Sequence, residues 1–155
     1  MDRVAALKRC RLTETFSPTG LKILAAVAKE RAVEAGEVVF SAGDAATGLF
    51  VIAEGMVSVR AEAPNGDPVE LGRLRVGEPL GALSLLGAKT HLVTVEAAEP
   101  TLLVELTAEA LKKLLEQKPQ AALKLLLAIS RDVGARLDTA APQLRAFAVA
   151  QLRSS

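Results

Sequence analysis

The spacing of apolar residues changes twice along the chain, which divides it into three parts. In the first part, apolar positions recur at helical spacing after Ser17, a good N-cap, and Pro18, which suits a first helical position because its missing N–H removes no hydrogen bond. This pattern predicts a helix over residues 17–30. A shorter helical turn is predicted before it, over residues 6–12.

Short apolar runs separated by turn residues follow over residues 33–106, a pattern typical of a sandwich or barrel of short strands. Glu54-Gly55 leaves room only for a tight hairpin with Gly55 at positive φ. Asn65-Gly66 accepts the left-handed conformations of a hairpin turn and predicts a second reversal. The predicted strands are residues 38–41, 49–53, 56–61, 69–74, 92–97 and 101–106.

The helical period returns after Leu106, with Thr107 as the predicted N-cap of a helix that ends near Lys118. Pro119 cannot continue that helix but can begin the next one, predicted over residues 119–138. The apolar residues of this second helix spread over about 200° of its circumference, roughly twice what one contact surface requires. We therefore expect a homodimer in which the helix packs on a second copy of itself. The predicted dimer residues are Leu126, Ile129, Val133 and Leu137.

A second interpretation of the surplus apolar surface keeps the chain monomeric. In it, the segment after Pro142 forms one helix over residues 144–152 and folds back, so that Leu144, Phe147 and Leu152 cover the apolar arc. The residues after 139 are too few for a complete helix-turn-helix module. We therefore expect no DNA binding by this chain alone.

Composition and charge restrict the class of partner. Half of the 155 residues are hydrophobic and 24% are charged, which is typical of one globular domain over residues 1–155. The formal net charge of +1 gives no electrostatic footprint for nucleic acid. No segment approaches the roughly 20 apolar residues that cross a bilayer, and the lone Cys10 cannot form an internal disulfide. A cytoplasmic protein without membrane contact is predicted.

Catalytic and metal chemistry find little support in the sequence. The single histidine, His91, excludes a zinc or iron site built on two or more histidines. Neither a Ser-His-Asp nor a Cys-His arrangement is suggested, because Cys10 lies outside the predicted strands. We predict no enzyme activity, no catalytic residue, no metal and no cofactor.

Several fragments, taken in order and with their spacing, carry a resemblance to a known family. They are Gly43-Asp44, the run Leu49-Phe50-Val51-Ile52 with Gly55, Val57 and Val59, the run Gly77-Glu78-Pro79-Leu80-Gly81, Leu85-Leu86, and Thr94-Val95. Over residues 12–137 the chain resembles the cyclic nucleotide-binding domain of catabolite-activator-type regulators, kinase regulatory subunits and cyclic-nucleotide-gated channels. The resemblance implies a mainly β fold with flanking α-helices. It would comprise an N-terminal helical part over residues 12–31, a β-roll or jelly-roll barrel over residues 33–106 and C-terminal helices over residues 107–155.

The resemblance also implies a ligand site beneath a short loop-helix, residues 81–86 here. Gly81 would let the backbone approach the ligand, and Leu83 and Ser84 would offer N–H groups to a phosphate. The family's ribose-binding Glu and phosphate-binding Arg correspond to Ala82 and His91. The predicted pocket consists of Gly81, Ala82, Leu83, Ser84, His91 and Leu92.

Loss of both groups predicts weak or absent binding of cyclic AMP and cyclic GMP, because each charge-assisted hydrogen bond contributes about 1.5–3 kcal/mol. A protonated His91 could replace part of the arginine's role, and binding would then tighten as pH falls. The interpretation we favour makes His91 a half-exposed strand residue without ligand contact. Two functions stay open: a regulatory sensor for a cyclic nucleotide or another small anionic ligand, and a ligand-free dimerisation or docking module.

Overall fold

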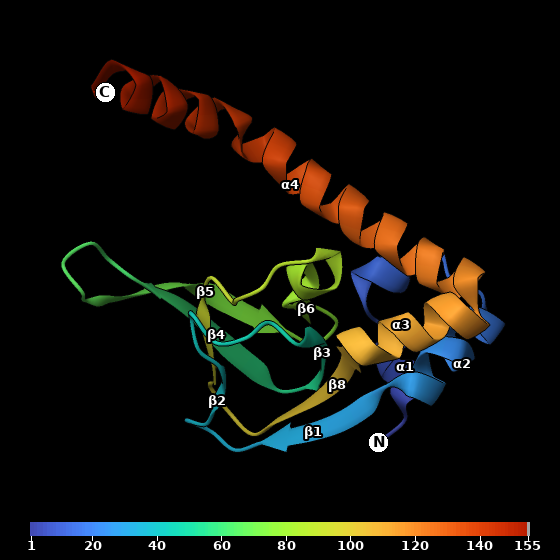
Figure 1. The fold of residues 1–155 in the computed structure, drawn as a ribbon. Helices are drawn as coiled ribbons and strands as arrows, with labels where there is room; N and C mark the ends of the chain where they lie inside the picture. The colour runs from blue at the N-terminus through green and yellow to red at the C-terminus, as the bar shows by residue number, and fades with distance from the viewer. Residues whose placement is uncertain (155) are drawn as a thin grey trace.

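The computed structural model describes the backbone of residues 1–154 and the side chains of residues 1–139, 142, 149 and 153. Within this described part, eight strands form two antiparallel sheets with the strand orders β1-β8-β3-β6 and β2-β7-β4-β5 (Figure 1). The predicted β-roll is confirmed. Its strands are β1 (Lys29–Val33), β2 (Val38–Phe40), β3 (Gly48–Glu54), β4 (Met56–Glu62), β5 (Pro68–Arg75), β6 (Pro79–Leu80), β7 (Thr94–Ala97) and β8 (Thr101–Thr107).

Helices precede and follow the sheets, as predicted (Figure 1). The Ser17 and Thr107 side chains accept hydrogen bonds from the N–H groups of Gly20 and Ala110, which confirms both predicted N-caps. The helical turn predicted over residues 6–12 is divided into two short helices. The helices are α1 (Arg3–Lys8), η1 (Arg11–Thr13), α2 (Pro18–Val27), η2 (Ala82–Leu86), α3 (Ala108–Gln117) and α4 (Pro119–Ser154), of which η1 and η2 are 3₁₀ helices.

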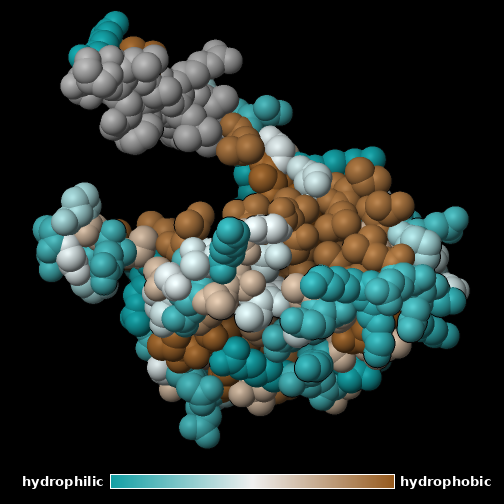
Figure 2. Space-filling model, in the orientation of Figure 1, coloured by the Kyte–Doolittle hydropathy of each residue, from teal (hydrophilic) through white to brown (hydrophobic). Residues whose placement is uncertain are grey.

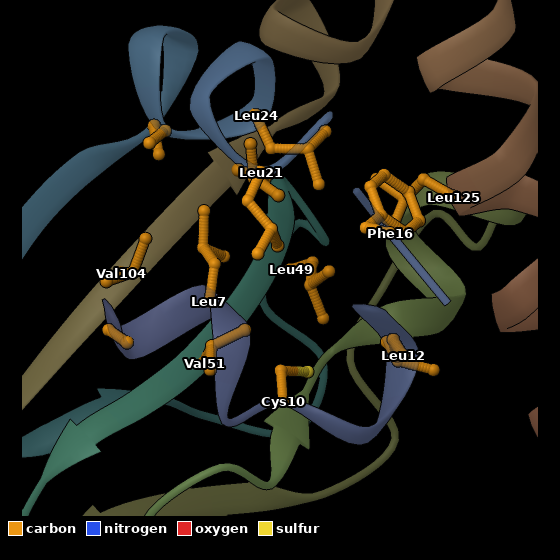
Figure 3. Close-up of a cluster of buried hydrophobic side chains, with 14 of the residues drawn as sticks. Leu7, Cys10, Leu12, Phe16, Leu21, Leu24, Leu49, Val51, Val104 and Leu125 are labelled. Atoms are coloured by element: carbon orange, nitrogen blue, oxygen red, sulfur yellow. The ribbon is translucent and has the colours of Figure 1, made fainter. Parts of the chain in front are cut away.

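Strand β3 is buried on both faces because it lies between two apolar cores. Leu49, Val51 and Ala53 pack in a core with α1, α2 and α4, whereas Phe50 and Ile52 pack in a core shared by the two sheets. Figure 3 shows the first of these cores, with side chains of the N-terminal helices gathered against β3. The continuous apolar run of β3 is therefore the sequence signature of a strand that is covered on both sides.

Cys10 belongs to the same core as Leu49 (Figure 3). It is a free cysteine, and burial raises the pKa of its thiol. A raised pKa keeps the sulfur in its unreactive protonated form, so Cys10 acts as a packing residue.

The helix predicted over residues 17–30 is too long. Helix α2 ends at Val27, and β1 begins at Lys29 and pairs with β8 up to Val33. Three of the five residues of β1 are charged and only Val33 is buried, so no apolar alternation identifies this edge strand in the sequence. The β-roll therefore starts at Lys29 and not at residue 33. Strand β6 has only two residues and was not predicted.

The predicted hairpin at Gly55 is wrong, although its positive φ is confirmed. Gly55 has a φ of 96°, but β3 and β4 belong to different sheets. Gly55 is thus the corner at which the chain crosses between sheets, and a Cβ there would lie 2.6 Å from the Pro100 carbonyl oxygen. The second reversal is a hairpin as predicted: β4 pairs with β5 around Gly66, which has a φ of 87°.

Helix α4 is one helix of 36 residues that continues through Pro142. Its first half packs on the core, and its far end extends away from the sheets (Figure 1). The segment predicted as a separate helix over residues 144–152 continues α4, so the interpretation in which it folds back is wrong. The side chains of Leu144, Phe147 and Leu152 lie outside the described residues.

One of the four predicted dimer residues, Ile129, does not lie on a surface that a second copy could contact. Ile129 is 0% exposed and packs in the core of its own chain, so a second copy cannot reach it. Leu126 and Val133 are partly buried against the same core, and Leu137 is exposed.

No helix within the described residues combines the length and apolar character needed to cross a bilayer.

Candidate functional site

A cavity of about 520 Å³ lies between η2 and α4, with further walls from η1, the sheet residues Phe40 and Leu74, and the loop before β7. Its volume is within the range of small-molecule sites in proteins. Two elements that are far apart in the sequence therefore share one cavity. The lining residues are Arg11, Phe40, Ala46, Leu74, Pro79, Gly81, Ala82, Leu83, Ser84, Ala88, Thr90, His91, Leu92, Val93, Asp132, Val133, Arg136 and Leu137.

All six residues of the predicted pocket line this cavity. Leu92 is exposed and lies before β7, which begins at Thr94, so the strand predicted over residues 92–97 starts two residues too early. Ser84 is buried, whereas Leu83 is exposed at the surface of η2. The structure thus brings the predicted residues together, while their environments differ from those expected.

Gly81 is required by the packing of the chain itself. It has a φ of 69°, and a Cβ there would lie 2.9 Å from the Gly48 carbonyl oxygen and 3.3 Å from His91 Cε1. The Ser84 N–H, one of the two groups expected to face a phosphate, donates to the Gly81 carbonyl oxygen at 3.0 Å. The backbone at η2 is therefore less available to an anion than the sequence predicted.

His91 is a buried loop residue and not the half-exposed strand residue that was predicted. It is 7% exposed, and its backbone exchanges hydrogen bonds with Gly43 and Asp44. Its ring stacks on Phe40 with the ring centroids 3.6 Å apart. Burial lowers the pKa of His91, and the Asp44 carboxylate offsets this only in part. A neutral imidazole at pH 7 does not replace the positive charge of an arginine.

The lowered pKa of His91 predicts a loss of stability in mild acid. Between the folded pKa and the unfolded value near 6.5, the unfolded chain binds more protons, so the free energy of unfolding falls as pH drops below about 6.5. We expect urea denaturation at pH 7.5 and pH 5.5 to show a smaller pH-dependent loss for His91→Phe than for the wild type. His91 is the single histidine of the sequence, so the difference isolates its titration. An equal loss in both proteins would contradict the assignment.

Two arginines at the α4 side of the cavity share one aspartate. Arg11 donates from Nε and Nη2 to the two carboxylate oxygens of Asp132, at 2.9 and 3.1 Å, and Arg136 Nε donates to the same carboxylate at 3.3 Å. Glu78 lies 4.0 Å from Arg11. The two positive and two negative charges of this group cancel, so both arginines are already matched by carboxylates.

Sequence reasoning missed this charged group. Arg11 and Asp132 are 121 residues apart, and no local pattern connects them. The available signal was the spacing of Asp132 and Arg136, since oppositely charged residues four positions apart lie on one helix face. That signal indicates a surface ion pair and does not indicate that the pair borders a cavity.

The family model described as cyclic nucleotide-binding domain matches residues 30–118, which is more than half of the chain. The chain belongs to the cyclic nucleotide-binding domain family. The matched region of this cyclic nucleotide-binding domain includes η2 and His91, so it contains most of the cavity wall. The resemblance in the sequence is therefore confirmed.

Relatives of this cyclic nucleotide-binding domain occur in regulators and in a channel-like protein. It is 32% identical over 108 residues to Putative potassium channel protein RPA4233 of Rhodopseudomonas palustris, and the match covers 70% of this chain and 26% of that protein. The N-terminal domain of a transcriptional regulator from Streptomyces coelicolor A3(2) has 27% identity and a TM-score of 0.77, over 86% of this chain and 95% of that one.

The chain also shares its fold with Thermus thermophilus Catabolite Activator Protein, with 23% identity and a TM-score of 0.79, over 89% of this chain and 63% of that one. It spans only 26% of the length of the channel-like relative. What the matches have in common is a regulatory module of the cyclic nucleotide-binding type.

Proposed function

We propose that this domain is a regulatory sensor in which a small molecule in the cavity shifts α4, and that it binds cyclic AMP and cyclic GMP weakly or not at all. The observation that carries the proposal is that η2 and α4 line the same cavity, α4 through Asp132, Val133, Arg136 and Leu137. A ligand in contact with both elements favours one arrangement of α4 against the sheets. The similarity to a transcriptional regulator supports a non-enzymatic role and a cytoplasmic location.

The side chains around the cavity support weak binding of cyclic nucleotides. Ala82 offers only a methyl group at the position that the sequence resemblance assigns to a ribose-binding Glu. His91 is neutral, and Arg11 and Arg136 are paired with Asp132. A phosphate would have to displace a carboxylate that makes two charge-assisted hydrogen bonds to Arg11. The cavity therefore lacks the interactions that would offset the dehydration of a phosphate.

Calorimetric titration with cyclic AMP and cyclic GMP tests this part of the proposal. We expect dissociation constants weaker than roughly 0.1 mM for both ligands, corresponding to less than about 5.5 kcal/mol of binding free energy. Dissociation constants of about 10 µM or tighter for either ligand would show that other groups replace the missing Glu and Arg.

Dimerisation through α4 is a second role, favoured by the leucines that α4 leaves exposed. Leu123 and Leu127 are 53% exposed and Leu137 is 54% exposed. Together with Ser130 and Gly134 they follow the alternating spacing of four and three residues that defines a coiled-coil seam. Figure 2 shows hydrophobic surface gathered around η2 and the first half of α4. We propose that the same seam of a second copy covers these leucines.

Replacing Leu127 and Leu137 by Asp is expected to weaken self-association at least about a hundredfold. Each buried leucine contributes roughly 1.5–3 kcal/mol, and a factor of ten corresponds to about 1.4 kcal/mol. Sedimentation velocity over a range of concentrations measures the change. Leu71→Asp is the matched control, because Leu71 is 59% exposed but lies on β5. A monomeric wild-type chain, or an equal effect of the control, would contradict the α4 interface.

A further inference from the structure

The side chains that line the cavity between η2 and α4 are mainly apolar. Eleven of the eighteen lining residues are Ala, Val, Leu, Phe or Pro. They include Phe40 below the His91 ring, Leu74 on β5 and Val133 on α4. Most of the sugar and phosphate oxygens of a nucleotide would lose their water on such walls and regain few hydrogen bonds. The walls instead suit a ligand whose surface is mostly carbon.

Ser84 contributes a polar atom that its own chain leaves unused. The residue is 8% exposed and lines the cavity. Its Oγ is buried and has no hydrogen-bond partner among the described residues. A buried hydroxyl without a partner is unfavourable, and a ligand oxygen beside it would remove that penalty. Ser84 Oγ is therefore a hydrogen-bonding group of a cavity-lining residue that the described part of the chain does not satisfy.

The charges around the cavity are already compensated. Asp132 holds both Arg11 and Arg136, and Glu78 lies on the other side of Arg11. An anionic ligand would have to displace Asp132 from a bidentate pair, and a cationic ligand would compete with two arginines for the same carboxylate. An uncharged ligand can bind without breaking the ion pairs of Asp132 or competing for its carboxylate.

We propose that the cavity binds an uncharged, mainly apolar small molecule with a hydroxyl or carbonyl oxygen, and that this oxygen hydrogen-bonds to Ser84. The proposal rests on the sensor function proposed above and names the class of ligand that the sensor detects. The apolar part of the molecule contacts Val133 and Leu137, which are the cavity residues of α4 that a carbon surface can engage. Occupancy of the cavity is thereby linked to the position of the helix.

Three bicyclic compounds of similar size separate the contributions of charge and of the hydroxyl: 1-naphthol, 1-methylnaphthalene and 1-naphthoate. Binding is measured on the full chain by NMR of labelled Leu and Val methyl groups. We expect 1-naphthol to cause saturable shifts of Leu74, Val93, Val133 and Leu137, and 1-naphthoate to bind at least tenfold more weakly. Tighter binding of 1-naphthoate or cyclic AMP than of 1-naphthol would overturn the ligand class and leave the sensor function standing.

Ser84→Ala tests the hydrogen bond, and Ala88→Phe tests the location. We expect Ser84→Ala to weaken 1-naphthol about three- to tenfold and 1-methylnaphthalene less than twofold, since only the first compound has a hydroxyl. Ala88 lines the cavity and is half-buried, so Ala88→Phe is expected to abolish binding of both compounds. The methyl spectrum of the core, which contains Leu24 and Val104, reports whether each variant is folded.

Four further outcomes have separate meanings. Equal weakening of both compounds by Ser84→Ala would overturn the hydrogen bond, and unchanged binding to Ala88→Phe would overturn the cavity as the site. Binding of 1-naphthol that shifts the η2 methyl groups but none on α4 would overturn the sensor function while leaving the ligand class intact. Absence of binding by all three compounds and by cyclic AMP would overturn both the sensor function and the proposed ligand class.

Discussion

The double variant Ala82→Glu and His91→Arg is expected to bind cyclic AMP at least tenfold more tightly than the wild-type chain. Both positions line the cavity, so a carboxylate at 82 can accept a hydrogen bond from the ribose and a guanidinium at 91 can pair with the phosphate. Each charge-assisted bond contributes about 1.5–3 kcal/mol, or roughly ten- to a hundredfold in affinity. Loss of the His91 stack on Phe40 offsets part of this gain. Calorimetry with cyclic AMP measures the result.

A matched control separates charge from size at the same two positions. The variant Ala82→Gln and His91→Gln places neutral amides there, and we expect it to bind cyclic AMP no more than about threefold more tightly than the wild type. No gain in the charged variant, with the fold retained, would show that the cavity does not hold a nucleotide in the orientation implied by the family.

Gly55→Ala is expected to lower the free energy of unfolding by about 2–5 kcal/mol. The φ of 96° is unfavourable for alanine by roughly 1–2 kcal/mol. The new Cβ would also lie 2.6 Å from the Pro100 carbonyl oxygen and 2.8 Å from Thr101 Cα, and such overpacking costs about 1–3 kcal/mol. Because both contacts are backbone atoms, the chain must move at the corner between the sheets. Urea denaturation monitored by circular dichroism measures the loss.

Gly66→Ala is the matched control for the corner glycine. Gly66 has a φ of 87°, close to that of Gly55, but an added Cβ would meet nothing within 4 Å. We expect this variant to lose only about 1–2 kcal/mol, the cost of the left-handed conformation. Equal losses in the two variants would mean that the close approach of residues 100 and 101 does not contribute.

Local signals in the sequence predicted the features that local chemistry determines. Asn65-Gly66 identified the β4–β5 hairpin, and Ser17 and Thr107 identified two helix starts, because turns and caps depend on neighbouring residues. Strand β1 was missed for the opposite reason. Its charged residues become a strand only through pairing with β8, which is distant in the sequence. At Gly55 the positive φ was a local property, whereas the sheet to which each flanking strand belongs was not.

For the candidate site too, the sequence predicted the local part and missed the contacts between distant segments. The family pattern identified all six residues around η2, which is a contiguous segment with the nearby His91. It did not predict the burial of His91, which depends on Phe40 from β2, or the contribution of Asp132 and Arg136 from α4. These contacts join segments that no sequence spacing relates. The chemistry that most distinguishes this cavity is therefore tertiary in origin.

The length of α4 gives small movements at the cavity a large effect elsewhere. Its 36 residues span about 54 Å at 1.5 Å per residue. The helix is anchored by Ala122, Leu125 and Ile129, and about 25 Å of it continues beyond Leu137. If the helix pivots at Ile129, a tilt of about 10° moves Leu137 sideways by about 2 Å and the end of the helix at Ser154 by about 6 Å. The helix would then act as a lever. Its short arm reaches the cavity residues and its long arm reaches the C-terminal end, so a small displacement at the cavity becomes a larger displacement at that end.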